Sequence, residues 1–294
     1  MPVHAEGGLV REERVGGRPE LEVKRTGSFV TPVVSVVLFV AAVFFIVAPL
    51  GWLLVLSFAK GFNFPSLTPT SITLGWWRDV FNSPGLVHSV FLSVTIAPVV
   101  LVVSAVLCLP AAYAIGRSDF FGKRAVLLSI FSVNAFPRIS LYVSMIPLLF
   151  LLNLMGTILG VVVVQLIGTL LFMTWIPATG FAAVPAELVE AARDAGATKF
   201  QVFRRVLLPL ARPSITVAAV LAFLAAFDEA QGTFLVGAPN YITMPVQMYN
   251  LVLNYPVGVS AVFAVLLSIP SVLLLLSVRK VLFGAGTSSA FHLR

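Results

Sequence analysis

The chain has 294 residues, of which 59% are hydrophobic and only 11% are charged. Soluble domains of this size carry about a quarter charged residues, so the composition excludes an ordinary soluble protein. The formal net charge of +7 does not indicate nucleic-acid binding, because the basic residues gather between long uncharged apolar runs. A run of about 20 apolar residues can cross a bilayer as a helix. The sequence therefore predicts an integral membrane protein.

Six apolar runs predict six transmembrane helices, because backbone groups in lipid must be hydrogen-bonded within their own segment. The runs cover approximately residues 29–58, 86–116, 125–152, 157–183, 214–236 and 258–282. Prolines fall inside them, among them Pro98, Pro110, Pro137, Pro147, Pro177 and Pro270. Neighbouring helices can satisfy the carbonyls that these prolines free, so we expect kinks rather than breaks. The predicted fold class is all-α, with six membrane helices in residues 29–283 and tails at 1–28 and 284–294.

Lysine and arginine predict the orientation of these helices, because they are enriched on the cytoplasmic side. They gather in both tails, in the loop between the second and third runs, and in the loop between the fourth and fifth. Only Lys60 and Arg78 lie on the opposite side. We therefore expect both termini in the cytoplasm. The first run is too long, and begins too far along the chain, for a cleaved signal peptide.

Few side chains suit catalysis or metal binding. Cys108 is the single cysteine and lies in an apolar run, so we expect it to be a small buried hydrophobe. His88 is the one histidine near a predicted span, and no nucleophile–base pair or metal-ligand cluster accompanies it. An intramembrane enzyme is therefore the weakest hypothesis, and we predict neither a catalytic residue nor a metal site.

The cytoplasmic loop 184–213 predicts two short helices separated by a glycine. Glu187 and Glu190 favour the positive N-terminal end of the first helix, and Gly196 permits the left-handed backbone that ends it. The apolar face of this helix is small and flat and is formed by Leu188, Ala191, Ala192 and Ala195. Such a face lets another protein's surface approach closely. The alternative is an amphipathic helix that only lies among lipid headgroups.

The second helix of the loop begins with the spacing of a capping box, Thr198 followed by Gln201. Pro209 and Pro213 are expected to end it. Its phenylalanine and arginine side chains could rest in headgroups alone, whereas the alanine face of the first helix offers too little apolar area for lipid. The loop as a whole therefore favours a docking role.

The residues 190–192, Gly196 and 206–209 resemble the EAA motif of the permease subunits of ATP-binding-cassette (ABC) importers. That pattern is E-A-A, three residues, G, nine residues, then I-x-L-P, and this chain keeps every spacing with Val206 in place of the usual isoleucine. The resemblance implies a coupling helix that docks on a cytoplasmic ATPase subunit. The implied contact residues are Glu187, Glu190, Ala191, Ala192, Asp194, Gly196, Leu208 and Pro209.

The resemblance also implies partners and a location. A permease of this type works with two cytoplasmic ATPase subunits, a second permease that is similar but not identical, and an extracytoplasmic solute-binding protein. Residues 60–85 and 237–257 are the expected docking surface for the binding protein, and the prokaryotic cytoplasmic membrane is the expected location. The glycine-containing stretch 116–124 lacks the spacing and the Ser/Thr of a phosphate-binding loop. ATP and magnesium therefore belong to the partner subunits, and this chain is expected to bind no cofactor and to catalyse nothing.

Three ionisable residues, Arg138, Asp228 and Glu229, lie inside predicted spans. Burying a charge in the membrane is costly unless the charge is paired, so such residues mark functional sites. Arg138 and Asp228 lie at similar depth, and one hypothesis is an Arg138–Asp228 ion pair that leaves Glu229 free. The other is a cation-binding pocket, which Arg138 suits only if Asp228 neutralises it.

The surroundings of these charges resemble two branches of the permease family. Residues 226–229 and 243–246 are similar to S-F-D-E and T-L-P-V stretches of polyamine-type permeases, with alanine for serine and methionine for leucine. Residues 136–137 and 153–157 are closer to sugar-type permeases. The sequence favours a polyamine slightly, with a sugar or oligosaccharide as the alternative. Aromatic side chains such as Tyr249 could stack on either ligand, and the expected pathway residues are Arg138, Tyr142, Trp175, Phe227, Asp228 and Glu229.

A stand-alone secondary transporter is the remaining alternative. Asp228 and Glu229 could then be its ion-coupling acids. That hypothesis predicts transport without ATPase subunits, and it leaves the loop 184–213 without a role.

Overall fold

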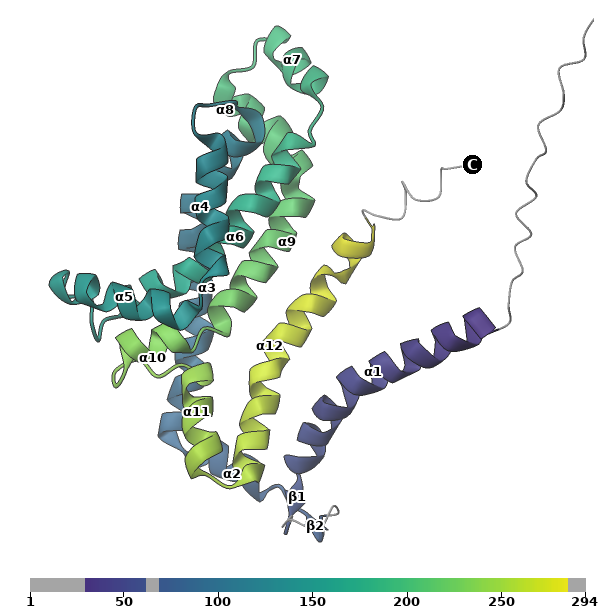
Figure 1. Ribbon diagram of the computed structural model, residues 1–294, viewed down its shortest axis with the longest axis vertical. Coiled ribbons are helices and arrows are strands. Elements are labelled where there is room, and N and C mark those ends of the chain that lie inside the picture. Colours follow the sequence, from purple (N-terminus) through teal and green to yellow (C-terminus); the bar gives the residue numbers. More distant parts are fainter. Residues whose placement is uncertain (1–29, 62–68, 285–294) are drawn as a thin grey trace, which may run out of the picture. The chain divides into compact units, whose positions relative to one another are not determined.

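The computed structural model describes residues 30–61 and 69–284 of the chain (Figure 1). The chain forms two units, residues 1–49 and 50–294, and each is considered by itself. The described part of the first unit is the beginning of α1 (Val30–Leu56). The predicted tails, residues 1–28 and 284–294, lie outside the described residues apart from Gly284.

The second unit consists almost wholly of helices. After the end of α1 come the short antiparallel strands β1 (Ala59–Lys60) and β2 (Ser71–Ile72), then α2 (Gly75–Asn82) and α3 (Pro84–Arg117). Next are α4 (Lys123–Ala135), α5 (Arg138–Leu151) and α6 (Ile158–Ala182). The remaining elements are α7 (Ala186–Asp194), α8 (Lys199–Val202), a π-helical turn (Phe203–Leu207), α9 (Leu208–Phe227), α10 (Gln231–Gly237), α11 (Met244–Asn254) and α12 (Val257–Gly284).

Five of the described helices are long and apolar enough to cross a membrane. They are Val34–Leu56, Pro84–Arg117, Ile158–Ala182, Lys199–Phe227 and Val257–Val278. The pair α4 and α5 gives a sixth if it counts as one bent span. The structure thus confirms the predicted fold class, an all-α membrane protein with five or six spans.

The third span is broken rather than kinked, which corrects the prediction of one continuous helix over 125–152. α4 and α5 meet at an angle of 105°. Phe136 between them has an extended backbone, with φ −81° and ψ 148°. Pro137 explains the break, because a proline ring disfavours the helical conformation of the residue before it. The break turns α5 out of line with α4 and places Arg138 at the first position of a new helix.

The fifth span also differs from its prediction, in both its start and its end. Pro209 and Pro213 do not end a helix, because the helical segment runs continuously from Lys199 to Phe227. The π-helical turn just before Pro209 is the physical reason: its wider turn relieves the clash between a proline ring and the carbonyl four residues earlier. The predicted end at 236 is wrong as well, since α9 stops at Phe227 and α10 is a separate helix.

The centre of the second unit is formed by α3, α6 and α9, which pack closely through small residues. A Cβ added at Gly116 on α3 would lie 2.4 Å from the backbone oxygen of Ala178 on α6. A Cβ at Gly180 on α6 would lie 2.6 Å from the Ser214 side chain on α9. Small residues let membrane helices approach in this way. The resulting core holds α7 and α8 at one end of the unit and α2 and α11 at the other (Figure 1).

Candidate functional site

The loop 184–209, called here the coupling segment, is anchored to the ends of α3 and α6 by apolar packing. Val189, Val202 and Leu207 are buried in one cluster with Ile115 of α3 and Phe181 of α6. Arg117, the last residue of α3, donates a hydrogen bond from Nη1 to the Val184 carbonyl oxygen at 2.8 Å. The segment is therefore a built part of the fold and not a free loop.

The turn between α7 and α8 has the geometry that the sequence predicts. Gly196 has a φ of +83°, and its N–H donates to the Arg193 carbonyl oxygen at 2.8 Å. The N–H of Ala197 reaches back to the carbonyl oxygen of Ala192 at 3.0 Å. These two bonds are the paired bonds of a Schellman helix end. Glycine is favoured here by the positive φ angle and not by a lack of space, since an added Cβ would meet nothing within 4 Å.

The predicted capping box at the start of α8 is confirmed. The Gln201 N–H donates to Thr198 Oγ1, and the Thr198 N–H donates to Gln201 Oε1 at 2.8 Å. Both ends of the turn are thus satisfied by local hydrogen bonds, which fixes the angle between α7 and α8.

The two faces of α7 divide the predicted contact residues. Leu188, Ala191 and Ala195 point outward, while Ala192 is half-buried against the anchoring cluster. Val189, which the sequence does not single out, makes the buried contact. Of the other predicted residues, Glu187, Glu190, Asp194, Gly196 and Pro209 are exposed and Leu208 is half-buried. The free surface of the coupling segment therefore combines small side chains with charges of both signs: the three acids and the exposed Arg193, Lys199, Arg204 and Arg205.

A second polar site, the Glu229 cluster, consists of Arg138, Tyr142, Glu229 and Gly232 at the break between α9 and α10. Glu229 is buried, and its Oε2 accepts a hydrogen bond from the Tyr142 hydroxyl at 2.6 Å. Its Oε1 accepts from the backbone N–H of Gly232 at 2.9 Å. Arg138 Nη1 lies 3.7 Å from Glu229 Oε2. Two hydrogen-bond donors and one guanidinium thus converge on one buried carboxylate and tie α5 to the start of α10.

This arrangement corrects the expected Arg138–Asp228 pair. Arg138 lies beside Glu229 instead, and the Asp228 side chain is exposed. The expectation assumed that one helix carries both acids, but α9 ends at Phe227 and Asp228 is its C-cap. The chain turns at that point, so helical spacing no longer sets the directions of the two side chains.

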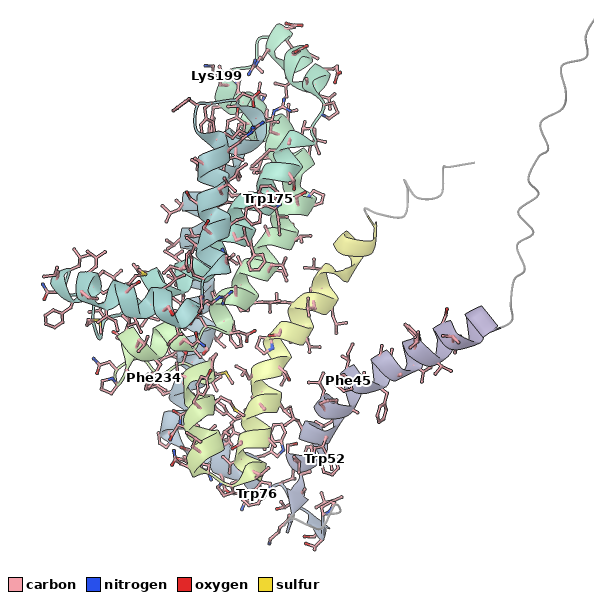
Figure 2. All side chains as sticks on the ribbon, in the orientation of Figure 1. Phe45, Trp52, Trp76, Trp175, Lys199 and Phe234 are labelled. Atoms are coloured by element: carbon pink, nitrogen blue, oxygen red, sulfur yellow. The ribbon has the colours of Figure 1, made fainter. Side chains whose placement is uncertain are left out.

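Of the other expected pathway residues, only Tyr142 is brought into the Glu229 cluster. Tyr142 and Phe227 are buried inside the subunit. Trp175 lies on α6 and contacts the Phe131 ring edge-on, at a centroid distance of 4.8 Å. Figure 2 shows Trp175 well away from Phe234 on α10. The predicted set is therefore split between the Glu229 cluster, the core and the face between α4 and α6.

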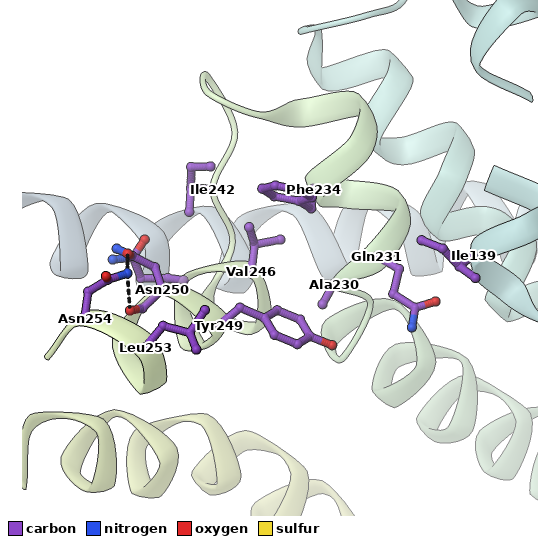
Figure 3. Close-up of a pocket in the computed structure, with 11 residues that line it drawn as sticks. Ile139, Ala230, Gln231, Phe234, Ile242, Val246, Tyr249, Asn250, Leu253 and Asn254 are labelled. Atoms are coloured by element: carbon purple, nitrogen blue, oxygen red, sulfur yellow. Dashed lines mark hydrogen bonds between the residues drawn. The ribbon is translucent and has the colours of Figure 1, made fainter. Parts of the chain in front are cut away.

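A cavity of about 640 Å³, called here the amide pocket, lies next to the Glu229 cluster (Figure 3). Its lining residues come from α5, α10, α11 and the chain just before α11: Ile139, Ala230, Gln231, Phe234, Ile242, Val246, Gln247, Tyr249, Asn250, Leu253 and Asn254. No lining residue is charged. A neighbouring cavity of about 430 Å³ shares Tyr249 and Leu253 with it and is also lined by Asp228. Of the residues that line the amide pocket, only Tyr249 was expected from the sequence to contact a ligand, although the spacing 247, 250, 254 places three amides on one face of a helix.

A multi-span membrane bundle with an anchored coupling segment at one end and a polar break inside its spans defines an integral membrane transport component. The chain belongs to the family of binding-protein-dependent transport system inner membrane components, whose sequence pattern matches residues 108–283. The resemblance to EAA-motif ABC importer permeases is thereby confirmed. Permeases of such systems work with ATPase subunits, a second permease and a solute-binding protein.

Curated relatives include permeases for different solutes. The trehalose transport system permease protein SugB of Mycobacterium tuberculosis is 28% identical, with a match that covers 76% of this chain and 84% of that protein. The spermidine/putrescine transport system permease protein PotC of Haemophilus influenzae is 29% identical, and its match covers 60% of this chain and 69% of that protein.

Among solved structures, a bacterial ABC transporter that imports the acidic polysaccharide alginate has a similar fold. The TM-score is 0.66 at 21% sequence identity, and the match covers 85% of this chain and 96% of that one. This likeness supports the helical arrangement.

Proposed function

We propose that this chain is the permease subunit of an ATP-driven importer of a small carbohydrate. The observation that carries the choice of solute is the state of Glu229. A polyamine site needs free carboxylates, and Glu229 is occupied by the Tyr142 hydroxyl, the Gly232 N–H and Arg138. The guanidinium of Arg138 would moreover repel a polycation. We therefore propose the alternative solute, a sugar or oligosaccharide, in place of the polyamine that the sequence slightly favours.

The longer match to a trehalose permease than to a polyamine permease supports the same proposal. One observation still favours a polyamine as the second candidate: Asp228 is exposed and lines a cavity together with Tyr249. A single carboxylate beside an aromatic ring could bind one ammonium group. It would leave the second ammonium of a polyamine without a partner.

We propose further that the coupling segment docks on a cytoplasmic ATPase subunit, with both termini of the chain in the cytoplasm. Its outward face combines small residues, which allow close contact, with the acids Glu187, Glu190 and Asp194 and the exposed bases Arg193 and Lys199. ATP and magnesium would be bound by two such subunits, and this chain would supply no catalytic group. The other proposed partners are a similar, non-identical permease and an extracytoplasmic binding protein, for which residues 60–85 and 237–257 are the proposed docking surface.

Uptake by the reconstituted transporter tests the proposal. The chain is purified with its neighbouring subunits and placed in proteoliposomes with ATP inside or outside. We expect ATP-dependent uptake of a neutral disaccharide such as trehalose and none of spermidine. Uptake of spermidine but not of trehalose would support the second candidate. Uptake of either solute by this chain without ATPase subunits would favour a secondary transporter.

A further inference from the structure

We infer that the amide pocket is a carbohydrate-binding subsite on the path through this chain. The inference rests on the proposed function and adds to it the residues that hold the sugar. The cavity of about 640 Å³ falls within the range of small-molecule pockets, roughly 300–1,000 Å³. It combines an apolar wall with a few amides, which is the composition that such pockets share.

The amides form a row that can read hydroxyl groups. Gln247, Asn250 and Asn254 recur at i, i+3 and i+7, so they lie on one face of α11. Asn254 Nδ2 donates to Asn250 Oδ1 at 2.8 Å, which orders this pair (Figure 3). Within the part of the chain that the structure describes, the Asn250 NH₂ group and the Asn254 side-chain oxygen have no further partner. A donor and an acceptor side by side match adjacent hydroxyls of a sugar, each of which both donates and accepts.

The remaining pocket amides are unpartnered too. In residues 30–61 and 69–284, neither the Gln231 nor the Gln247 side chain makes a hydrogen bond. Uncharged amides facing hydrocarbon would each cost free energy, so this surface does not face lipid. They offer a cation no counter-charge, because all eleven lining residues are neutral. The pocket therefore suits a neutral polyhydroxylated ligand better than a polyamine.

Two aromatic side chains supply the stacking surface that a sugar ring needs. Tyr249 is 60% exposed and Phe234 is 57% exposed, and both line the pocket. In Figure 3 the Tyr249 ring extends from α11 toward the Ala230 end of α10. The face of an aromatic ring carries partial negative charge, which attracts the polarised C–H groups on the apolar face of a pyranose.

The walls of the pocket are held in place by buried bonds, so the site is formed before a ligand arrives. The Met244 N–H at the start of α11 donates to Ser93 Oγ of α3 at 2.7 Å. Gln165 Nε2 of α6 donates to Thr233 Oγ1 of α10 at 3.0 Å. The Glu229 cluster joins α5 to the start of α10, directly before Ala230 and Gln231. A preformed site loses less conformational freedom on binding.

Cysteine protection in the assembled transporter tests the inference. Cys108, the single native cysteine, is buried, which gives a low labelling background. Leu253→Cys introduces a thiol at an exposed pocket position without removing an amide. We expect a water-soluble maleimide to label it and trehalose to slow the labelling, with no effect of spermidine. Asn82→Cys on α2, an exposed position outside the pocket, is the matched control and should be labelled at an unchanged rate.

A second substitution in the Leu253→Cys background separates contact from structure. Tyr249→Ala should raise the trehalose concentration for half-protection about tenfold, whereas Tyr249→Phe, which keeps the ring, should change it less than about threefold. Trehalose uptake without protection at position 253 would overturn the subsite and leave the proposed function standing. Absence of labelling in the assembled complex would also overturn it, because another subunit would then cover the pocket. A transporter that imports no carbohydrate would overturn the proposed function itself.

Discussion

The coupling segment and the Glu229 cluster are both fixed to the same helical bundle, but by different forces. The coupling segment rests on apolar contacts of Val189, Val202 and Leu207, and its polar bonds are local and near the surface. The Glu229 cluster rests on hydrogen bonds to one buried carboxylate between elements distant in sequence. Apolar packing loses stability in proportion to the volume removed. Removal of a buried carboxylate has a large effect in one step, because the hydrogen-bond donors around it are left buried and unpaired.

The largest effect is expected from Glu229→Ala. The substitution leaves the Tyr142 hydroxyl and the Gly232 N–H without an acceptor in a buried site and removes the partner of Arg138. We expect a loss of about 3–5 kcal/mol in the free energy of unfolding. Thermal unfolding of the purified chain in detergent measures it. Glu229→Gln, which keeps an acceptor of the same shape, should lose only about 1–2 kcal/mol. Equal losses for the two variants would show that the bonds to the carboxylate are not what holds the break.

Val189→Ala probes the apolar anchor of the coupling segment. Removal of two buried methyl groups should cost about 2 kcal/mol. Leu188→Ala is the matched control, because Leu188 lies on the same helix but is 47% exposed. Its stability should change by less than about 0.5 kcal/mol. The reverse order in unfolding experiments would mean that α7 presents its other face to the bundle.

Gly196→Glu separates stability from coupling. A residue with a side chain at φ +83° should cost about 1–2 kcal/mol, with no steric clash in this chain. The bulk and charge on the docking face should nevertheless abolish ATP-dependent uptake in vesicles. Gly122→Glu has the same strain, with φ +85° and nothing within 4 Å of the added Cβ, but lies outside the coupling segment. It should retain transport. Normal uptake by Gly196→Glu would count against the docking role.

The smallest effect is expected from Arg138→Met. The Arg138 side chain is 44% exposed and lies 3.7 Å from the carboxylate, so its pairing energy is weakened by solvent. We expect a loss of at most about 1 kcal/mol, measured by the same thermal unfolding. A loss as large as that of Glu229→Ala would place the guanidinium, and not the Tyr142 hydroxyl, at the centre of the cluster.

What the sequence could predict follows from the same difference between local and distant interactions. Four of the six apolar runs (the first, second, fourth and sixth), the Gly196 turn and the Thr198–Gln201 capping box depend on neighbouring residues, and the structure confirms these predictions. The position of the third-span break at Pro137 is visible in the sequence, but its angle is set by packing. Pro209 failed as a helix end because a π-helical turn accommodates it.

The polar sites depended on contacts that sequence spacing cannot supply. The end of α9 at Phe227 turns Glu229 inward and Asp228 outward, and no pattern within the run marks that end. In the nine-residue α7, Leu188 and Val189 are both apolar and adjacent in sequence, and helical period favours the alanine-rich Leu188 face, whereas packing buries Val189. The amide row of α11 is visible in the sequence, but the opposite wall of its pocket comes from α5 and α10.

Photo-crosslinking from the coupling segment tests most directly whether another subunit's ATP hydrolysis drives this chain. A photoreactive residue replaces Ala191 on the outward face of α7, and a second variant carries it at Leu253, at the other end of the unit. We predict that Ala191, but not Leu253, crosslinks to a nucleotide-binding ATPase subunit in the assembled transporter and that ATP alters the yield. Efficient transport with no ATPase crosslinked at 191 would contradict the account.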